Sequence, residues 1–168
     1  MACVGRSAAL GGLLVALLAG PPEAQGSFVQ RGDGLVFYLA DPGEQNELTI
    51  DSEPGVHILS DPGATVSAAP PCITDGTTAL CPAQPSDFVF VDLSDANDSL
   101  ESLSDFSVGA CTGTGDDVAV GGEPRDVFRG EGGHDTLVGR GGNDTLNTDA
   151  PCESGGTAPG RDRRESTQ

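Results

Sequence analysis

The sequence predicts an all-β protein in which a small strand-rich module continues into an array of short repeats. Short runs rich in Val, Ile and Phe end at turn signals such as Pro-Gly, as strands do. Beyond the start of the chain, no window has the roughly 3.6-residue periodicity of a helix. From Thr112 onward, a nine-residue pattern of glycines, Asp and apolar residues recurs. Together these observations predict strands separated by tight turns.

The composition favours an acidic binding protein over an enzyme. The chain of 168 residues carries 26 Asp and Glu against eight basic residues, all Arg, and its formal net charge is −18. Such a surface repels nucleic acid and anionic membranes, so its expected partners are cations, although acidity can also serve solubility alone. Trp is absent and there is one Tyr. We expect no enzymatic activity, because few aromatics argue against a large core and no catalytic motif is present.

Residues 1–26 have the pattern of a secretory signal peptide. Arg6 gives a short positive start, residues 8–19 are apolar and rich in Leu and small residues, and a polar stretch follows. Cleavage is expected between Gly20 and Gly26. Because no other apolar run is long enough for a membrane helix, we expect the mature chain to be secreted, extracellular and soluble.

Residues 27–93 are predicted to form a small β module. Its expected strands lie at 35–39, 47–50, 56–59 and 88–93, and most of them are bounded by Pro-Gly turns. Removing the signal peptide also removes one cysteine and leaves four.

An even number of cysteines in an exported chain favours disulfides. Cys72 and Cys81 enclose a short polar loop and are the best pair. A metal site is the rival interpretation, but the chain has no CxxC motif and its two His residues are not suitably spaced. By elimination, Cys111 pairs with Cys152 across the repeats.

The nine-residue repeat occupies residues 112–148 in four copies. Its sixth position is always Asp, its eighth is always apolar, and its fourth is Gly except in the second copy. The sixth-position residues are Asp117, Asp126, Asp135 and Asp144, and the eighth-position residues are Ala119, Phe128, Leu137 and Leu146. The fourth-position glycines are Gly115, Gly133 and Gly142. A partial copy within residues 94–111 is one residue out of phase, so the array is expected to be interrupted around 101–111. The polar tail, 149–168, is expected to be disordered apart from Cys152.

This pattern resembles the G-G-x-G-x-D-x-U-x repeat of RTX, or hemolysin-type, calcium-binding proteins. Two further stretches, 38–46 and 91–98, resemble segments of exported bacterial proteins that carry such repeats. The resemblance implies a parallel β-roll (β-solenoid) of about four nonapeptide coils, each made of a turn and a short strand. It also implies that repeats two apart lie on the same side of the roll.

The resemblance further implies calcium ions as cofactor and partner. Calcium binds about six to eight oxygen atoms and tolerates irregular geometry, so Asp carboxylates and backbone carbonyls can supply its ligands. Repeats on the same side would pair Asp117 with Asp135, and Asp126 with Asp144. The glycines at the fourth position let the turns bring carbonyls close together. Asp98, from the partial copy, is a further candidate.

Several residues depart from the repeat pattern. Pro124 and Arg125 interrupt the second turn, and Glu131 and Arg140 replace glycines at the second position. Arg near the turns should lower cation affinity, and residues other than Gly should strain the turns. We therefore expect weak sites, with dissociation constants of about 10⁻⁴ to 10⁻³ M. A degenerate array that winds without holding metal tightly is the alternative.

Other functions stay open at this point. The chain could be a surface adhesion or spacer module that binds an unknown protein or glycan through residues 28–93. It could also be a fragment of a longer RTX protein. The tripeptide at residues 31–33 matches an integrin motif, but three residues match by chance often.

Overall fold

The computed structural model describes residues 26–152, and these residues form fourteen β-strands and no helix. The expectation of an all-β protein is therefore confirmed. The predicted signal peptide lies outside the described residues except for Gly26, as does most of the predicted tail. Within the described part of the chain, no helix is long and apolar enough to cross a membrane.

The strands fall into two groups along the chain. The first group is β1 (Ser27–Gly32), β2 (Leu35–Leu39), β3 (Glu47–Glu53), β4 (Val56–Ser60), β5 (Val66–Ala68), β6 (Ile73–Thr74) and β7 (Thr78–Pro82). The second group is β8 (Phe88–Asp92), β9 (Ser99–Ser102), β10 (Val108–Cys111), β11 (Val118–Val120), β12 (Val127–Arg129), β13 (Thr136–Val138) and β14 (Thr145–Asn147). Each strand expected within 35–93 overlaps a strand of the structure.

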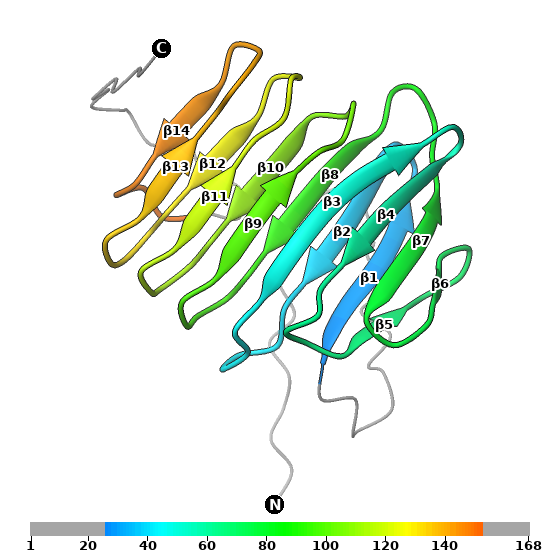
Figure 1. The fold of residues 1–168 in the computed structure, drawn as a ribbon, viewed down its shortest axis with the longest axis horizontal. Helices are drawn as coiled ribbons and strands as arrows, with labels where there is room; N and C mark the ends of the chain where they lie inside the picture. Colours follow the sequence, from blue (N-terminus) through cyan, green and yellow to red (C-terminus); the bar gives the residue numbers. More distant parts are fainter. Residues whose placement is uncertain (1–25, 153–168) are drawn as a thin grey trace, which may run out of the picture.

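The strands form two facing sheets of seven strands each (Figure 1). The order is β14-β12-β10-β8-β2-β1-β5 in sheet A and β13-β11-β9-β3-β4-β7-β6 in sheet B. From β8 to β14 the chain alternates between the sheets, and each strand pairs in parallel with the next but one. Near the N-terminus, β1 pairs with β2 and β3 with β4 in antiparallel fashion. β1 also pairs in parallel with β5, so both sheets are mixed, and from β8 to β14 all strand pairs are parallel.

The segment where the sequence analysis expects an interruption contains β10, which pairs with both β8 and β12. In each coil, one backbone N–H donates to the Asp carboxylate of the next turn on the same edge. The two residues are 19 positions apart for Asp98 and Asp117, but 18 apart for Val108 and Asp126 and for the later pairs. The additional residue therefore lies between Asp98 and Val108. The stack accommodates it there, so the chain keeps alternating between the sheets through residues 101–111.

One hydrophobic core lies between the sheets and runs from the module into the repeats. Two rows of inward side chains follow the strand pairing from one coil to the next. They are Tyr38, Val91, Ala110, Phe128 and Leu146 in sheet A, and Leu48, Leu100, Ala119 and Leu137 in sheet B. The apolar eighth positions of the repeats therefore continue rows that begin in the N-terminal module. Only the last residue of each row is partly exposed.

A buried polar cluster joins β1, β4 and the turn before β8. The Arg31 guanidinium donates to both Asp87 carboxylate oxygens, at 2.5 and 3.1 Å, and Asp87 Oδ2 lies 3.0 Å from His57 Nε2. The side chains of Arg31 and Asp87 are 7% and 0% exposed. The arginine of the integrin-like tripeptide is therefore held inside the protein and not presented to a receptor.

Asp87→Asn is expected to destabilise the protein by about 3–5 kcal/mol, because it leaves the buried Arg31 without a counter-charge. Burial raises the pKa of Asp87, but hydrogen bonds from Arg31 and His57 outweigh burial and hold the pKa at about 2. Since the pKa is below its ordinary value, the stabilisation is complete above about pH 4 and is lost as pH falls through 2. Urea unfolding measures both effects. The exposed Asp105→Asn is the control, and an equal loss in both variants would contradict the role of the cluster.

Candidate metal centre

The turns between strands stack along two edges of the structure. Turns 41–46, 94–98, 112–117 and 130–135 each lead from sheet A to sheet B, and they form what we term the first edge. Turns 103–107, 121–126 and 139–144 lead from sheet B back to sheet A and form the second edge. Isolated bridges from Asp95 to Thr114 and from Thr114 to Gly132 hold successive first-edge turns side by side.

A column of four equivalent side chains runs along the first edge, one from each turn. Each of its three Asp carboxylates accepts, through Oδ1, the backbone N–H of the member in the preceding turn. Asn46 N donates to Asp98 at 2.8 Å, Asp98 N to Asp117 at 2.8 Å, and Asp117 N to Asp135 at 3.2 Å. We term Asn46, Asp98, Asp117 and Asp135 the first-edge column. These bonds fix one oxygen of each carboxylate against the neighbouring turn.

The remaining oxygen of each column member is buried and lacks a hydrogen-bond partner within the described residues. These atoms are Asn46 Oδ1, Asp98 Oδ2, Asp117 Oδ2 and Asp135 Oδ2. Leaving a buried acceptor unsatisfied costs about 1–3 kcal/mol, and more when the group is charged. A row of such oxygens on the same edge is the arrangement in which a bound cation would replace the missing partners.

The electrostatics of the first-edge column also favour a bound cation. Burial raises the pKa of Asp98 to about 7, and the negative charge of Asp117 adds to the shift against the hydrogen bond from Asn46. Burial also raises the pKa of Asp117, and the charge of Asp135 contributes to that shift. Without a positive charge nearby, ionised carboxylates in this column are therefore unfavourable.

Two predicted glycines lie where first-edge turns approach most closely. A Cβ on Gly133 would lie 1.6 Å from the Gly115 carbonyl oxygen, and a Cβ on Gly115 would lie 1.6 Å from the Ala96 carbonyl oxygen. Neither carbonyl accepts one of the hydrogen bonds that join these turns. Glycine thus allows carbonyl oxygens of one turn to point at the next, where they could serve as ligands together with the column. The third predicted glycine, Gly142, lies on the second edge, where a Cβ on it would be 2.6 Å from the Pro124 carbonyl oxygen.

The second edge has the same ladder but fewer free oxygens. Asp126 Oδ1 accepts the Val108 N–H at 2.8 Å, and Asp144 Oδ1 accepts the Asp126 N–H at 2.9 Å. However, Asp126 Oδ2 already accepts the Gly122 N–H at 2.8 Å. Burial raises the pKa of Asp126, as does the charge of Asp144.

Arginines also lie on the second edge. Arg125 donates to the Asn143 carbonyl, and Arg140 pairs with Glu101 at 2.6 Å. Pro124 lies in the same turn as Arg125, so three of the four departures from the repeat pattern fall on this edge. The fourth, Glu131, lies on the first edge. Glu131 and Arg140 have φ of 72° and 62°, which agrees with the expectation that they strain their turns.

The structure therefore places Asp117 beside Asp135 and Asp126 beside Asp144, each pair on one edge. It also adds Asp98 and Asn46 to the first of these sets. Asn46 was not among the residues expected from the sequence, although Leu48 follows it at the same spacing as Ala119 follows Asp117. Its turn has Asn in place of Asp, which conceals the pattern.

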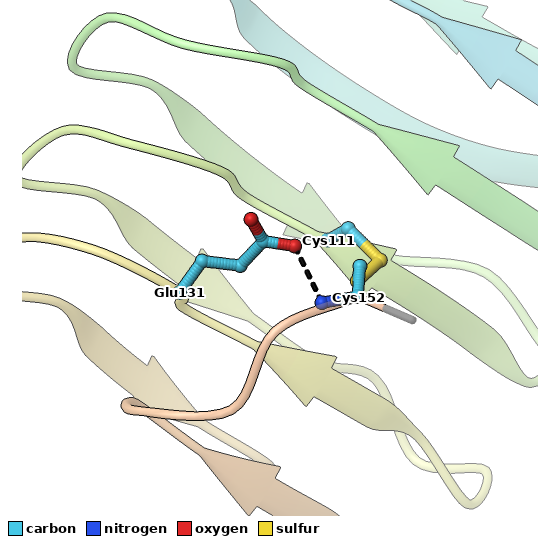
Figure 2. Close-up of side chains that lie close together, drawn as sticks. All are labelled: Cys111, Glu131 and Cys152. Atoms are coloured by element: carbon cyan, nitrogen blue, oxygen red, sulfur yellow. Dashed lines mark hydrogen bonds between the residues drawn. A yellow bond between two sulfur atoms is a disulfide. The ribbon is translucent and has the colours of Figure 1, made fainter. Parts of the chain in front are cut away.

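Both expected cysteine pairs lie at disulfide distance, Cys72 with Cys81 and Cys111 with Cys152. Figure 2 shows the second pair beside Glu131, whose Oε1 accepts the Cys152 N–H at 2.6 Å. Within residues 26–152, these three residues form the one group of three or more His, Cys, Asp or Glu side chains whose ligand atoms all lie within 4.8 Å of one another. Because the two sulfurs are bonded to each other, this group ties the chain after β14 to β10 and does not offer thiolate ligands.

Comparison with known proteins agrees with the geometry of the repeats. A family model, the RTX calcium-binding nonapeptide repeat, matches residues 112–146 in four copies. No curated protein and no solved structure matches the chain. The match covers about a fifth of the sequence, and it contains Asp117, Asp126, Asp135 and Asp144. Residues 112–146 are thus four copies of the RTX calcium-binding nonapeptide repeat.

Proposed function

We propose that this chain is an extracellular calcium-binding protein whose repeats form a parallel β-roll stabilised by calcium between stacked turns. The observation that carries the proposal is a pair of buried carboxylate oxygens, those of Asp117 and Asp135 on adjacent turns, that have no hydrogen-bond partner among residues 26–152. The calcium would stabilise the fold and would not take part in catalysis.

The donor set of the first edge suits calcium better than other common metal ions. Neighbouring turns are about 4.8 Å apart, as adjacent strands are, so a cation between two turns meets two carboxylates and the carbonyls that point into the gap. Calcium accepts such sets of oxygens, whereas magnesium requires near-octahedral geometry and keeps several waters. Zinc favours His and Cys ligands, but the first-edge turns contain no Cys and one His, the exposed His134.

The two edges should differ in affinity. On the first edge, the gap between Asp117 and Asp135 has two free oxygens and no arginine in its turns. On the second edge, Asp126 has one oxygen already bonded and Arg125 and Arg140 lie in the turns. We therefore assign the stronger calcium site to the first edge and a weaker one to the second.

The wider organisation of the chain is part of the same proposal. A signal peptide at 1–26 would export the chain, and the β module at 27–93 would precede the coils that begin at 94. Extracellular calcium modules have dissociation constants of about 10⁻⁴ to 10⁻³ M, which suits weak sites of this kind.

Isothermal titration calorimetry of the mature chain with calcium and with magnesium tests the proposal. We expect calcium to bind in the range of about 10⁻⁴ to 10⁻³ M and magnesium to bind more weakly. Asp135→Asn should weaken calcium binding by about tenfold, and Asp144→Asn should have a smaller effect. An absence of calcium binding, or equal binding of both ions, would instead favour the adhesion or spacer function.

A further inference from the structure

We infer that the calcium column extends beyond the RTX repeats into the N-terminal module, with Asp98 and Asn46 forming two additional calcium positions. One position lies between turns 94–98 and 112–117, and the other between turns 41–46 and 94–98. The inference rests on the proposed function, and it concerns turns that precede the matched residues 112–146.

Asp98 has the same environment as the Asp residues of the repeats. It is 3% exposed, its Oδ1 accepts the Asn46 N–H, and its Oδ2 is buried with no hydrogen-bond partner in the described part of the chain. The adjacent turn contributes Asp117, whose Oδ2 is likewise buried and has no hydrogen-bond partner within residues 26–152. The Ala96 carbonyl points at Gly115 across the same gap, as the Gly115 carbonyl points at Gly133 one coil further on. The gap between Asp98 and Asp117 therefore offers the same donors as the gap between Asp117 and Asp135.

Asn46 presents its oxygen in a fixed orientation. Its Nδ2 donates to Asp61 Oδ2 at 2.8 Å and to Tyr38 Oη at 3.2 Å, and Ser27 Oγ lies at 3.3 Å. Because the acceptors surround Nδ2, the amide cannot flip without losing them, and Oδ1 stays on the opposite side. Asn46 is 1% exposed, and its Oδ1 has no hydrogen-bond partner among the described residues. Side-chain amide oxygens are ordinary calcium ligands.

The charges around these two turns favour a cation. Turn 41–46 contributes Asp41 and Glu44, and turn 94–98 contributes Asp95 in addition to Asp98. Neither turn contains an arginine, unlike the second edge. The two turns already touch, because the Gly43 N–H donates to Asp95 Oδ1. A calcium ion between them would neutralise part of this charge and join residues that are 52 positions apart in the chain.

Such a position would couple the module to the repeats. Asn46 is bonded to Asp61 and Tyr38, which belong to the buried network of the module. Asp98 is bonded to the next coil through Asp117. Calcium held by Asn46 and Asp98 would therefore stabilise the boundary at which the coils begin.

Terbium luminescence can test these positions separately from the repeats. Tyr38 is the one tyrosine of the chain and Trp is absent, so light absorbed by tyrosine sensitises a terbium ion only close to Tyr38. Terbium titrated into the mature chain should give sensitised emission that calcium displaces. Asp98→Asn, which keeps the acceptor for the Asn46 N–H, should raise the terbium concentration for half-maximal emission by about tenfold. Asp135→Asn should change this concentration by less than about twofold, since Asp135 lies three turns away from Asn46.

The outcomes separate this inference from the proposed function. If calorimetry detects calcium binding but Asp98→Asn leaves the terbium titration unchanged, the additional positions are refuted and the repeat sites stand. If Asp135→Asn weakened the terbium emission as much as Asp98→Asn does, the additional positions would also be refuted. If the unaltered chain binds no calcium, the proposed function fails and this inference fails with it. Tyr38 emission without terbium checks that the variant module is folded.

Discussion

Gly133→Ala is expected to prevent the last coils from stacking, whereas Gly132→Ala at the neighbouring position is expected to be tolerated. A Cβ on Gly133 would lie 1.6 Å from the Gly115 carbonyl oxygen, and Gly133 has a φ of +135°. A disfavoured backbone conformation costs about 1–3 kcal/mol and overpacking about 1–3 kcal/mol more. Together these are comparable with the whole stability of a small domain.

Gly132 is the matched control because it lies in the same turn and differs in both respects. Its nearest neighbour would be Thr114 Cγ2 at 3.6 Å, an ordinary contact, and its φ is not positive. Chemical unfolding in calcium compares the two variants with the unaltered protein. If both alanines had the same effect, the close stacking of turns 112–117 and 130–135 would not be a determinant of stability.

The double variant Asp117→Asn and Asp135→Asn is expected to lower stability in calcium but not in a chelator. In a chelator, the variant should be as stable as the unaltered protein or more stable, because burial raises the pKa of Asp117 and its ionised form is unfavourable there. With calcium at ten times the dissociation constant, binding stabilises the unaltered protein by about 1.4 kcal/mol per site. The variant loses this contribution.

Thermal unfolding in calcium and in chelator measures how the stability difference between the two proteins depends on calcium. A loss of about 1.4 kcal/mol lowers Tm by roughly 3–6 °C in a chain of this size, so the effect is measurable. Asp116→Asn removes one carboxylate charge from an exposed neighbour of Asp117 and serves as the control. A double variant that is less stable by the same amount under both conditions would mean that the carboxylates act through hydrogen bonds alone.

The repeats could be predicted from the sequence because their chemistry is periodic. The spacing of Asp117, Asp126, Asp135 and Asp144 follows from the coil length, and the apolar residue two positions later follows from burial between the sheets. The coil that contains β10 could not be recognised, since Val108 occupies the position where the repeats have Asp. A strand at that place needs only an inward apolar residue, here Ala110, and pairing partners on both sides.

The contribution of the N-terminal module to the site could not be predicted for a different reason. Asn46 and Asp98 are 52 residues apart in the chain, so no local periodicity connects them. They meet because β3 pairs in parallel with β9, which depends on the packing of the module as a whole. By contrast, the placement of Arg125 and Arg140 on one edge follows from the resemblance, because they lie in repeats two apart.

The most direct test of the account is far-UV circular dichroism of the mature chain, titrated with calcium against a magnesium control. The account predicts that the chelated chain keeps the β signal of its N-terminal module and gains further β signal with calcium, because binding and folding of the coils are coupled. Magnesium at the same concentration should give little gain. A spectrum that calcium leaves unchanged, whether already folded or unfolded, would contradict the claim that calcium along the first edge stabilises the repeats.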